Sequence, residues 1–504
     1  DPEFDPDNIK YSCVRYSPSF IANAMGPSWS DPRTGEILNA SVYLYHNLVG
    51  LVRNWRFVQT AQADTDVRRK QLPTDILGDC ISYVVAHEVG HTFAFMHNMA
   101  ASSSIPVDSL RSASFTNKYG TTYSIMDYAR NNYVAQPGDK EKGVRLTPPD
   151  LGIYDYFSVK WLYSPIMSAK SSEEEIPILR QWISEKLPDP AYRYGRQQIR
   201  TRIDPSSFEE DLGDDPVKAS SYGVMNLKYI LSQMNEWIKD DVEGDFRKEI
   251  YNEIIGQYIR YINNVLFNIG GIYVNEHYEG DPFPSYVPVT KEKQRESLKF
   301  LWEQALDCSW IDEPALQKIL PLHSNLSSVI ENLIIDYVLK RFPSVAICGD
   351  KMEQNPYTQL DYMDDLYYYM FMVPDKKNVL SASEKNMQLK FVSYLMNGIK
   401  TVKKGSAAGT SGRMLTDERI PLPEGIVAPT YLYDGPLNHF NDPKEVMGFE
   451  DTVSVTIPVE SMEHHYYSML RKIERLAKNR MSAGSDENRT HYRLLVYKIS
   501  QSLK

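Results

Sequence analysis

Three histidines between residues 87 and 97 constrain the fold of this chain more than any other feature. The segment reads His-Glu-Val-Gly-His-Thr-Phe-Ala-Phe-Met-His. His87 and His91 are four residues apart, so an α-helix would place both imidazoles on one face, as a shared tetrahedral Zn²⁺ requires. Apolar residues at positions 76, 77, 80, 81, 84 and 85 recur every three or four residues and predict that this helix packs on a core.

The third histidine, His97, can join this pair only if the helix ends before it. Each helical residue adds about 100°, so on an unbroken helix His97 would lie roughly 240° round from His91 and would face away from the metal. The chain must therefore turn between these two residues. Glu88 would then lie beside the metal and not on it.

The segment resembles the active-site motif of the metzincin metallopeptidases, H-E-x-x-H-x-x-G-x-x-H with a later methionine turn. Residues 124 to 128, Ser-Ile-Met-Asp-Tyr, have the form of that turn. The resemblance implies that Met126 lies beneath the metal and that Tyr128 is a switchable ligand or a transition-state donor. Ala94 replaces the glycine of the family motif, and an L-residue in a left-handed conformation costs about 1–2 kcal/mol, which a folded core can absorb.

In zincins of another type, a glutamate on a later helix is the third ligand. After Glu88 this chain has no glutamate until Glu141, and the nearest downstream carboxylates are those of Asp108 and Asp127. His97 is therefore the best candidate for the third ligand.

Further segments resemble a family of large, secreted bacterial zinc-dependent metalloproteases, many of which are known only as domains of unknown function. These segments are residues 26–38, 87–92, 124–128, 135–137 and 210–215. The likeness runs through most of the chain and is strongest in residues 1–165. It implies a secreted, periplasmic or cell-surface protein. The first residues have neither an initiator methionine nor a signal pattern, so we expect a processed or truncated product.

Composition narrows the classes of partner. The net charge of −11 argues against a nucleic-acid partner, because binding to phosphates needs clustered Lys and Arg. No apolar run approaches the roughly 20 residues that cross a bilayer, so we expect no transmembrane segment. Four scattered cysteines are too few for a disulfide framework or a cysteine metal site. The resemblance to metallopeptidases implies a protein or peptide substrate.

The patterns predict an α+β fold with a metzincin-like catalytic domain in residues 1–165. Residues 9–20 and 36–47 alternate as strands do, and by the resemblance residues 36–47 form the antiparallel edge strand that lines the substrate cleft. A complete metzincin fold has further elements ahead of this point, so we expect the catalytic domain to be N-terminally incomplete. Thr147-Pro148-Pro149-Asp150 predicts the start of the helix that closes this domain.

The remainder of the chain has helical periodicity. We expect a helical domain in residues 166–404 and a linker with a C-terminal region in residues 405–504, which starts with the Gly- and Ser-rich residues 405–412. Asp215 and Pro216 predict the cap and first residue of one helix. Further helices are predicted at 250–266, 290–306, 327–340, 359–371 and 384–402.

These observations predict a zinc-dependent endopeptidase. Zn²⁺ on His87, His91 and His97 would keep a fourth position for water and lower the pKa of that water to about 7. Glu88 would act as the general base, and Tyr128 would donate to the tetrahedral oxyanion. The alternatives are a catalytically silent binding or scaffold protein that retains the metzincin fold, and a non-proteolytic zinc hydrolase that acts on another amide.

Overall fold

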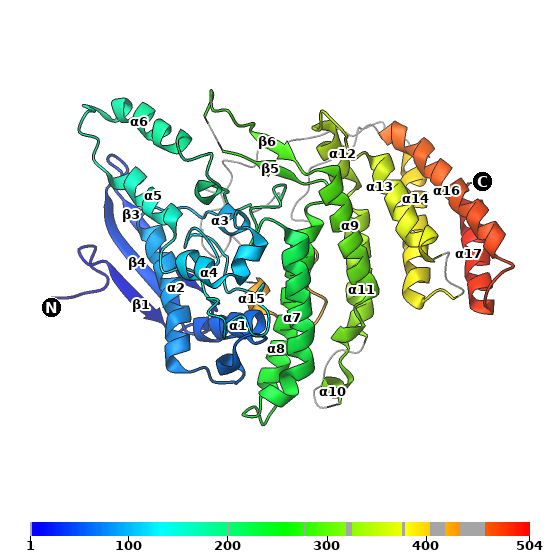
Figure 1. The fold of residues 1–504 in the computed structure, drawn as a ribbon, viewed down its shortest axis with the longest axis horizontal. Coiled ribbons are helices and arrows are strands. Elements are labelled where there is room, and N and C mark those ends of the chain that lie inside the picture. Colours follow the sequence, from blue (N-terminus) through cyan, green and yellow to red (C-terminus); the bar gives the residue numbers. More distant parts are fainter. Residues whose placement is uncertain are drawn as a thin grey trace.

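The computed structural model has a small β-sheet at one end and a long array of helices that extends away from it (Figure 1). This arrangement confirms the predicted α+β class with a helical C-terminal part. The structure describes residues 3–198, 202–276, 278–318, 325–374, 379–403, 419–432 and 459–503.

The sheet is built around β4 (Ile37–Tyr45). β4 pairs in parallel with β1 (Cys13–Ser17) and antiparallel with β2 (Ala24–Met25) and β3 (Ser28–Ser30). Both predicted strand regions are therefore strands. The prediction that residues 36–47 form the edge strand is wrong, because a turn at Asp31–Gly35, where Gly35 has a φ of +76°, folds residues 24–30 back along the outer side of β4.

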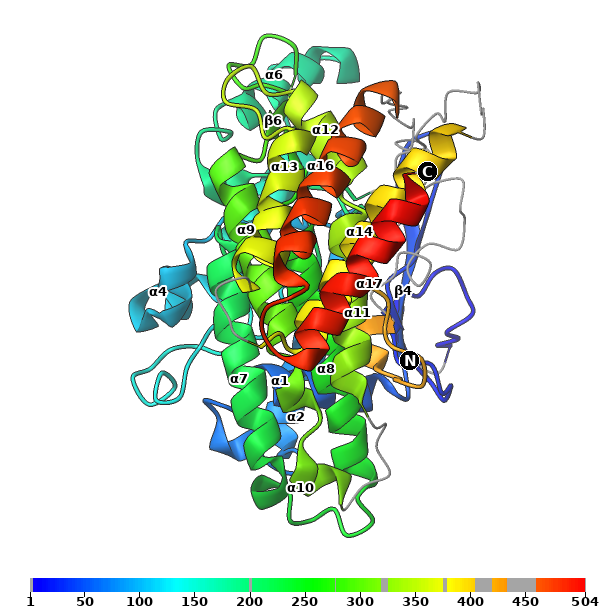
Figure 2. The same ribbon diagram turned by 90° about the vertical axis from the view of Figure 1, so that its right-hand side faces the viewer.

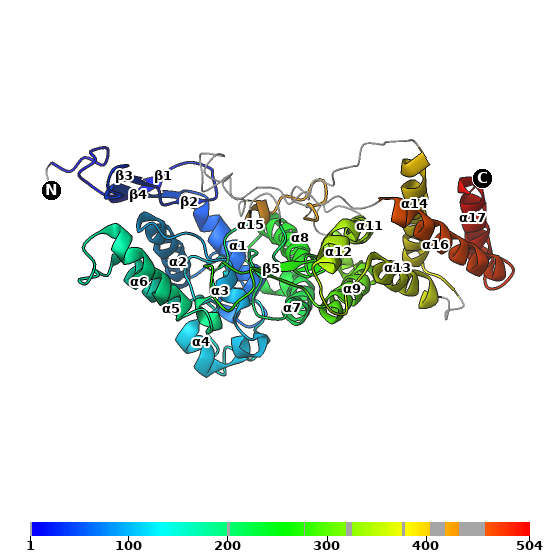
Figure 3. The ribbon, with the colours of Figure 1, turned by 90° about the horizontal axis from the view of Figure 1, so that it is seen from above.

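Two helices, α1 (Leu48–Thr60) and α2 (Thr74–Thr92), lie beneath the sheet (Figure 3). Leu51 and Trp55 of α1 and Val84 of α2 belong to one buried cluster, and Leu77, Cys80 and Ile81 of α2 pack against it. The apolar stripe that the sequence predicts on the histidine helix therefore faces a core. This packing fixes the helix that carries His87 and His91.

The helix after the methionine turn begins later than the sequence predicts. α5 runs from Ile153 to Tyr163, with Gly152 and not Thr147 or Asp150 at its N-cap. The carboxylate of Asp155 accepts a hydrogen bond from the backbone N–H of Gly152 at 2.6 Å. A Cβ on Gly152 would overlap the carbonyl of Tyr123, so only glycine allows this helix to approach the methionine turn.

The predicted helices of the second half are all present, with shifts of a few residues at their ends. Asp215 accepts from the backbone N–H of Lys218 at 3.1 Å and caps α7, whose first residue is Pro216 as predicted. The predicted runs correspond to α7 (Pro216–Trp237), α8 (Asp245–Leu266), α9 (Lys291–Leu306), α11 (Leu326–Leu339), α13 (Gln359–Tyr367) and α14 (Ala382–Lys403).

The other elements are short or lie at the far end of the array. α16 (Val459–Arg480) and α17 (Asp486–Ser502) pack with α14 at the end opposite the sheet (Figures 1 and 2). The remaining α-helices and β-strands of the described residues are α3 (Ala100–Ser103), α4 (Ala113–Tyr119), α6 (Ser172–Ser184), α10 (Pro314–Gln317), α12 (Phe342–Asp350), α15 (Pro429–Leu432), β5 (Ile272–Val274) and β6 (Tyr286–Pro288). Across the described ranges, no helix combines the length and apolar character that a bilayer span requires.

The apolar core runs through most of the helical array. A single buried cluster includes Phe57 of α1, Tyr133 after the methionine turn and Ile499 of α17. The division into residues 1–165, 166–404 and 405–504 stays a prediction, and the predicted linker at residues 405–412 lies outside the described residues.

Candidate metal centre

The three histidines converge because the chain turns sharply after α2. The helix ends at Thr92, and Ala94 has the left-handed conformation, with a φ of +60°, that turns the chain. The turn brings His97 back so that its Nε2 lies 3.2 Å from the Nε2 of His87 and 3.2 Å from that of His91. The prediction that the chain turns between His91 and His97 is therefore confirmed.

The donor chemistry of this cluster fits a zinc ion. His87 Nδ1 lies 2.6 Å from the carbonyl of Ile125, and His91 Nδ1 lies 3.0 Å from that of Phe95. A carbonyl only accepts, so each Nδ1 carries the proton and each Nε2 presents a lone pair to the centre, the tautomer that binds metal. Two nitrogens on one tetrahedral Zn²⁺ would be about 3.3 Å apart. The cluster can therefore hold the ion.

Glu88 lies next to the first ligand and is 2% exposed. Its Oε2 is buried and has no hydrogen-bond partner among the described residues. Burial raises the pKa of this carboxyl to about 8, and the positive charge of Arg130 opposes the rise. Burial also lowers the pKa of His91, which favours the neutral imidazole that a metal needs.

Met126 lies directly against the helix of the histidines. A Cβ on Gly90, between the two helical histidines, would overlap the sulfur of Met126. Met126 shares a small buried apolar cluster with Phe95 and Ile125, against which Ala86 packs. The structure thus places the predicted methionine under the turn of α2 that carries the ligands.

Tyr128 lies beside the histidines and is 2% exposed. The centre of its ring is 4.9 Å from that of His97 and 5.4 Å from that of His87. Tyr128, Glu88 and His87 line one small cavity of about 30 Å³. The six residues that the sequence predicts for the site are therefore brought together.

Asp155 is a further residue of this site that sequence reasoning missed. Its carboxylate accepts from the backbone N–H of Ile125 at 2.9 Å and from the Ser124 hydroxyl at 2.7 Å. Because the carbonyl of Ile125 in turn orients His87, Asp155 acts on a metal ligand through the methionine turn. Burial raises the pKa of Asp155, and these hydrogen bonds oppose the rise. In the sequence, the position of Asp155 in the first turn of a helix indicates only a helix cap.

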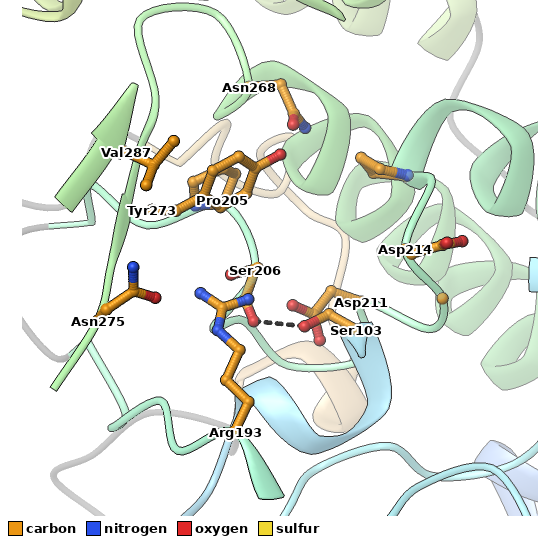
Figure 4. Close-up of a pocket in the computed structure, with 12 residues that line it drawn as sticks. Ser103, Arg193, Pro205, Ser206, Asp211, Asp214, Asn268, Tyr273, Asn275 and Val287 are labelled. Atoms are coloured by element: carbon orange, nitrogen blue, oxygen red, sulfur yellow. Dashed lines mark hydrogen bonds between the residues drawn. The ribbon is translucent and has the colours of Figure 1, made fainter. Parts of the chain in front are cut away.

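A larger cavity, of about 370 Å³, lies between α3, the loop at residues 205–216 and β5 (Figure 4). Arg193, Asp211 and Asn268 line it, and the hydroxyl of Ser103 donates to the carbonyl of Ser206 at 2.6 Å at its edge. None of the predicted site residues lines this cavity. His87, Glu88 and Tyr128 line the smaller cavity instead.

We predict that Ala94→Gly leaves the stability unchanged or slightly raised. The substitution removes left-handed strain of about 1–2 kcal/mol. The greater conformational entropy of glycine in the unfolded chain lowers this gain in stability by up to about 1 kcal/mol. Denaturant unfolding of both proteins measures the difference, and metal analysis should find equal metal. A clear loss of stability would contradict the strained turn.

We predict that Gly90→Ala destabilises the protein, although alanine favours a helix. The new methyl group would overlap the sulfur of Met126, and overpacking of this kind costs about 1–3 kcal/mol. Gly78 is the matched control in the same helix, because a Cβ there meets no atom within 4 Å. Gly78→Ala should stabilise by up to about 1 kcal/mol. Equal stabilisation by both substitutions would contradict the contact between Gly90 and Met126.

Comparison with known proteins agrees with this geometry. A family model described as Met-zincin matches residues 69–378, more than half of the chain. Among curated proteins and among solved structures, none matches this chain. The matched range contains the three histidines, which can hold the zinc ion that this family uses. The chain therefore belongs to the Met-zincin family.

Proposed function

We propose that the protein is a zinc-dependent endopeptidase. The observation that carries the proposal is the convergence of three imidazole nitrogens beside the buried carboxylate of Glu88. Such a site combines a metal with an adjacent base, which is the requirement for hydrolysis of a peptide bond by an activated water.

Each residue has a role that follows from its position. When bound, Zn²⁺ supplies a Lewis acid for the scissile carbonyl and the attacking water, and its charge favours the carboxylate form of Glu88. Glu88 then takes a proton from the water and returns it to the leaving amine. The hydroxyl of Tyr128 donates to the developing oxyanion, and Met126 fixes the helix turn that carries the ligands.

The substrate in this proposal is a protein or peptide in an extended conformation. The strands β2 and β3 pair only with β4 in the described sheet, so their other edge can accept a substrate strand. The segment of β2 and β3 lies close to the site, because a Cβ on Gly26, between these strands, would overlap the backbone carbonyl of Glu88. A secreted, periplasmic or cell-surface location is part of the same proposal.

We predict one zinc ion per chain, held by the three histidines. Elemental analysis of the dialysed protein measures the content. His87→Ala and His97→Ala should each lose the metal, because two imidazoles and water cannot replace the third ligand. Full zinc content in His97→Ala would show that the third ligand lies elsewhere.

We predict that Glu88→Gln keeps the zinc and the fold but lowers turnover by roughly 10²–10⁴-fold, the usual contribution of a general base. Digestion of a peptide library with and without a chelator measures the activity. Tyr128→Phe should lower turnover less, because it removes one donor and leaves the polarisation by the metal intact. Activity that persists in Glu88→Gln would refute the mechanism. A wild-type protein that binds zinc and cleaves no peptide would favour the silent binding protein.

A further inference from the structure

Arg130 packs directly against the tyrosine of the metal centre. Its guanidinium carbon lies 4.4 Å from the centre of the Tyr128 ring and 3.8 Å from that of Trp55 in α1. Arg130 has a φ of +56°, and its side chain is 8% exposed. A cation on a ring face attracts the ring and restricts its position. The ring of Tyr128 therefore lies close both to the histidines and to a cation.

Glu210 holds this arginine and also the backbone of Tyr128. It lies in the acidic stretch at residues 204–215 and is fully buried. Its Oε1 is 3.8 Å from Nε of Arg130, and its backbone N–H donates to the carbonyl of Tyr128 at 3.0 Å. Glu210 itself has a φ of +59°. One residue thus contacts the segment around Tyr128 by an ion pair from its side chain and by a hydrogen bond from its main chain.

Most of the groups that hold Glu210 come from α1 and α8, and the hydroxyl of Tyr133 also donates to its backbone carbonyl, at 3.0 Å. Gln59 and Gln257 each donate to its Oε2 at 2.6 Å, and Nε of Arg260 lies 3.5 Å from its Oε1. The amide of Asn264 donates to its backbone carbonyl at 2.9 Å. A buried carboxylate is stable only when it is surrounded by such donors. Its position is therefore set largely by α1 and α8, and α8 lies well beyond the metal-centre segments in the sequence.

We propose that Arg130 and Glu210 are positioning residues that hold Tyr128 at the metal centre, and that the helical half of the chain thereby takes part in catalysis. The inference rests on the proposed role of Tyr128 in peptide hydrolysis. It assigns to α8 a function beyond packing, because Gln257, Arg260 and Asn264 of this helix all contact Glu210.

The position of Tyr128 can be measured without any activity. We would replace Tyr128 by 3-fluorotyrosine in the metal-free Glu88→Gln protein and record its ¹⁹F resonance. The parent should give one narrow line. Arg130→Met and Glu210→Gln should each shift this line and broaden or split it, because the ring loses its cation or its anchor. An unchanged narrow line in folded Arg130→Met would overturn the proposal, and this variant decides the matter if Glu210→Gln does not fold.

Glu209 provides the matched control in the same loop. It is also buried, but its carboxylate forms a two-bonded pair with Arg202, at 2.7 and 2.9 Å. Glu209→Gln should lower the melting temperature and leave the ¹⁹F line unchanged. A change in the line equal to that of Glu210→Gln would show a general loosening of the loop and would overturn the specific role of Glu210.

Kinetics of the zinc-loaded enzyme give the second arm. Arg130→Met should lower kcat roughly 10-fold, which is the lower end of the loss expected for residues that orient the groups of a metal site. KM and the zinc content should change little. In a Tyr128→Phe background the same substitution should lower kcat much less, because the part that acts through Tyr128 is already lost and only the charge of Arg130 near Glu88 is removed. Independent, additive losses would overturn the proposal. If the wild-type protein cleaves no peptide, the proposed function fails, and the ¹⁹F arm still decides whether Arg130 and Glu210 position Tyr128.

Discussion

The hydrogen bond between His87 Nδ1 and the carbonyl of Ile125 is the interaction on which the metal centre depends. It joins two segments that are far apart in the sequence and fixes the tautomer and the rotation of the first ligand. Ile125 is itself held by Asp155 at the start of α5. Three elements therefore meet at the backbone of Ile125, and the geometry of the centre follows from their packing.

The sequence predicts the parts of the site that depend on local spacing. The four-residue separation of His87 and His91 predicts a shared helix face, and the position of His97 requires a turn, which the φ of Ala94 confirms. The Asp215-Pro216 pair likewise predicts the start of α7. Each of these signals is contained in a few consecutive residues, so no knowledge of the tertiary structure is needed to use it.

The sequence does not predict what depends on partners from distant segments. Alternation marks residues 36–47 as a strand but does not reveal that residues 24–30 cover its outer side. The Thr147–Asp150 segment has the composition of a cap, yet α5 starts at Ile153, because Asp155 binds the N–H groups of Gly152 and Ile125. Asp155 and Glu210 are ordinary acidic residues in the sequence, and only burial against specific donors distinguishes them.

Backbone conformation connects these observations. Five described residues other than glycine have a positive φ, and two of them are asparagines, which tolerate it. The other three are Ala94, Arg130 and Glu210. Ala94 makes the turn that brings in His97, and the other two lie in the network around Tyr128. A left-handed L-residue costs about 1–2 kcal/mol and persists only where the surrounding structure fixes it. Among the described residues, the backbone strain is therefore concentrated at the turn that brings in His97 and at the two residues beside Tyr128.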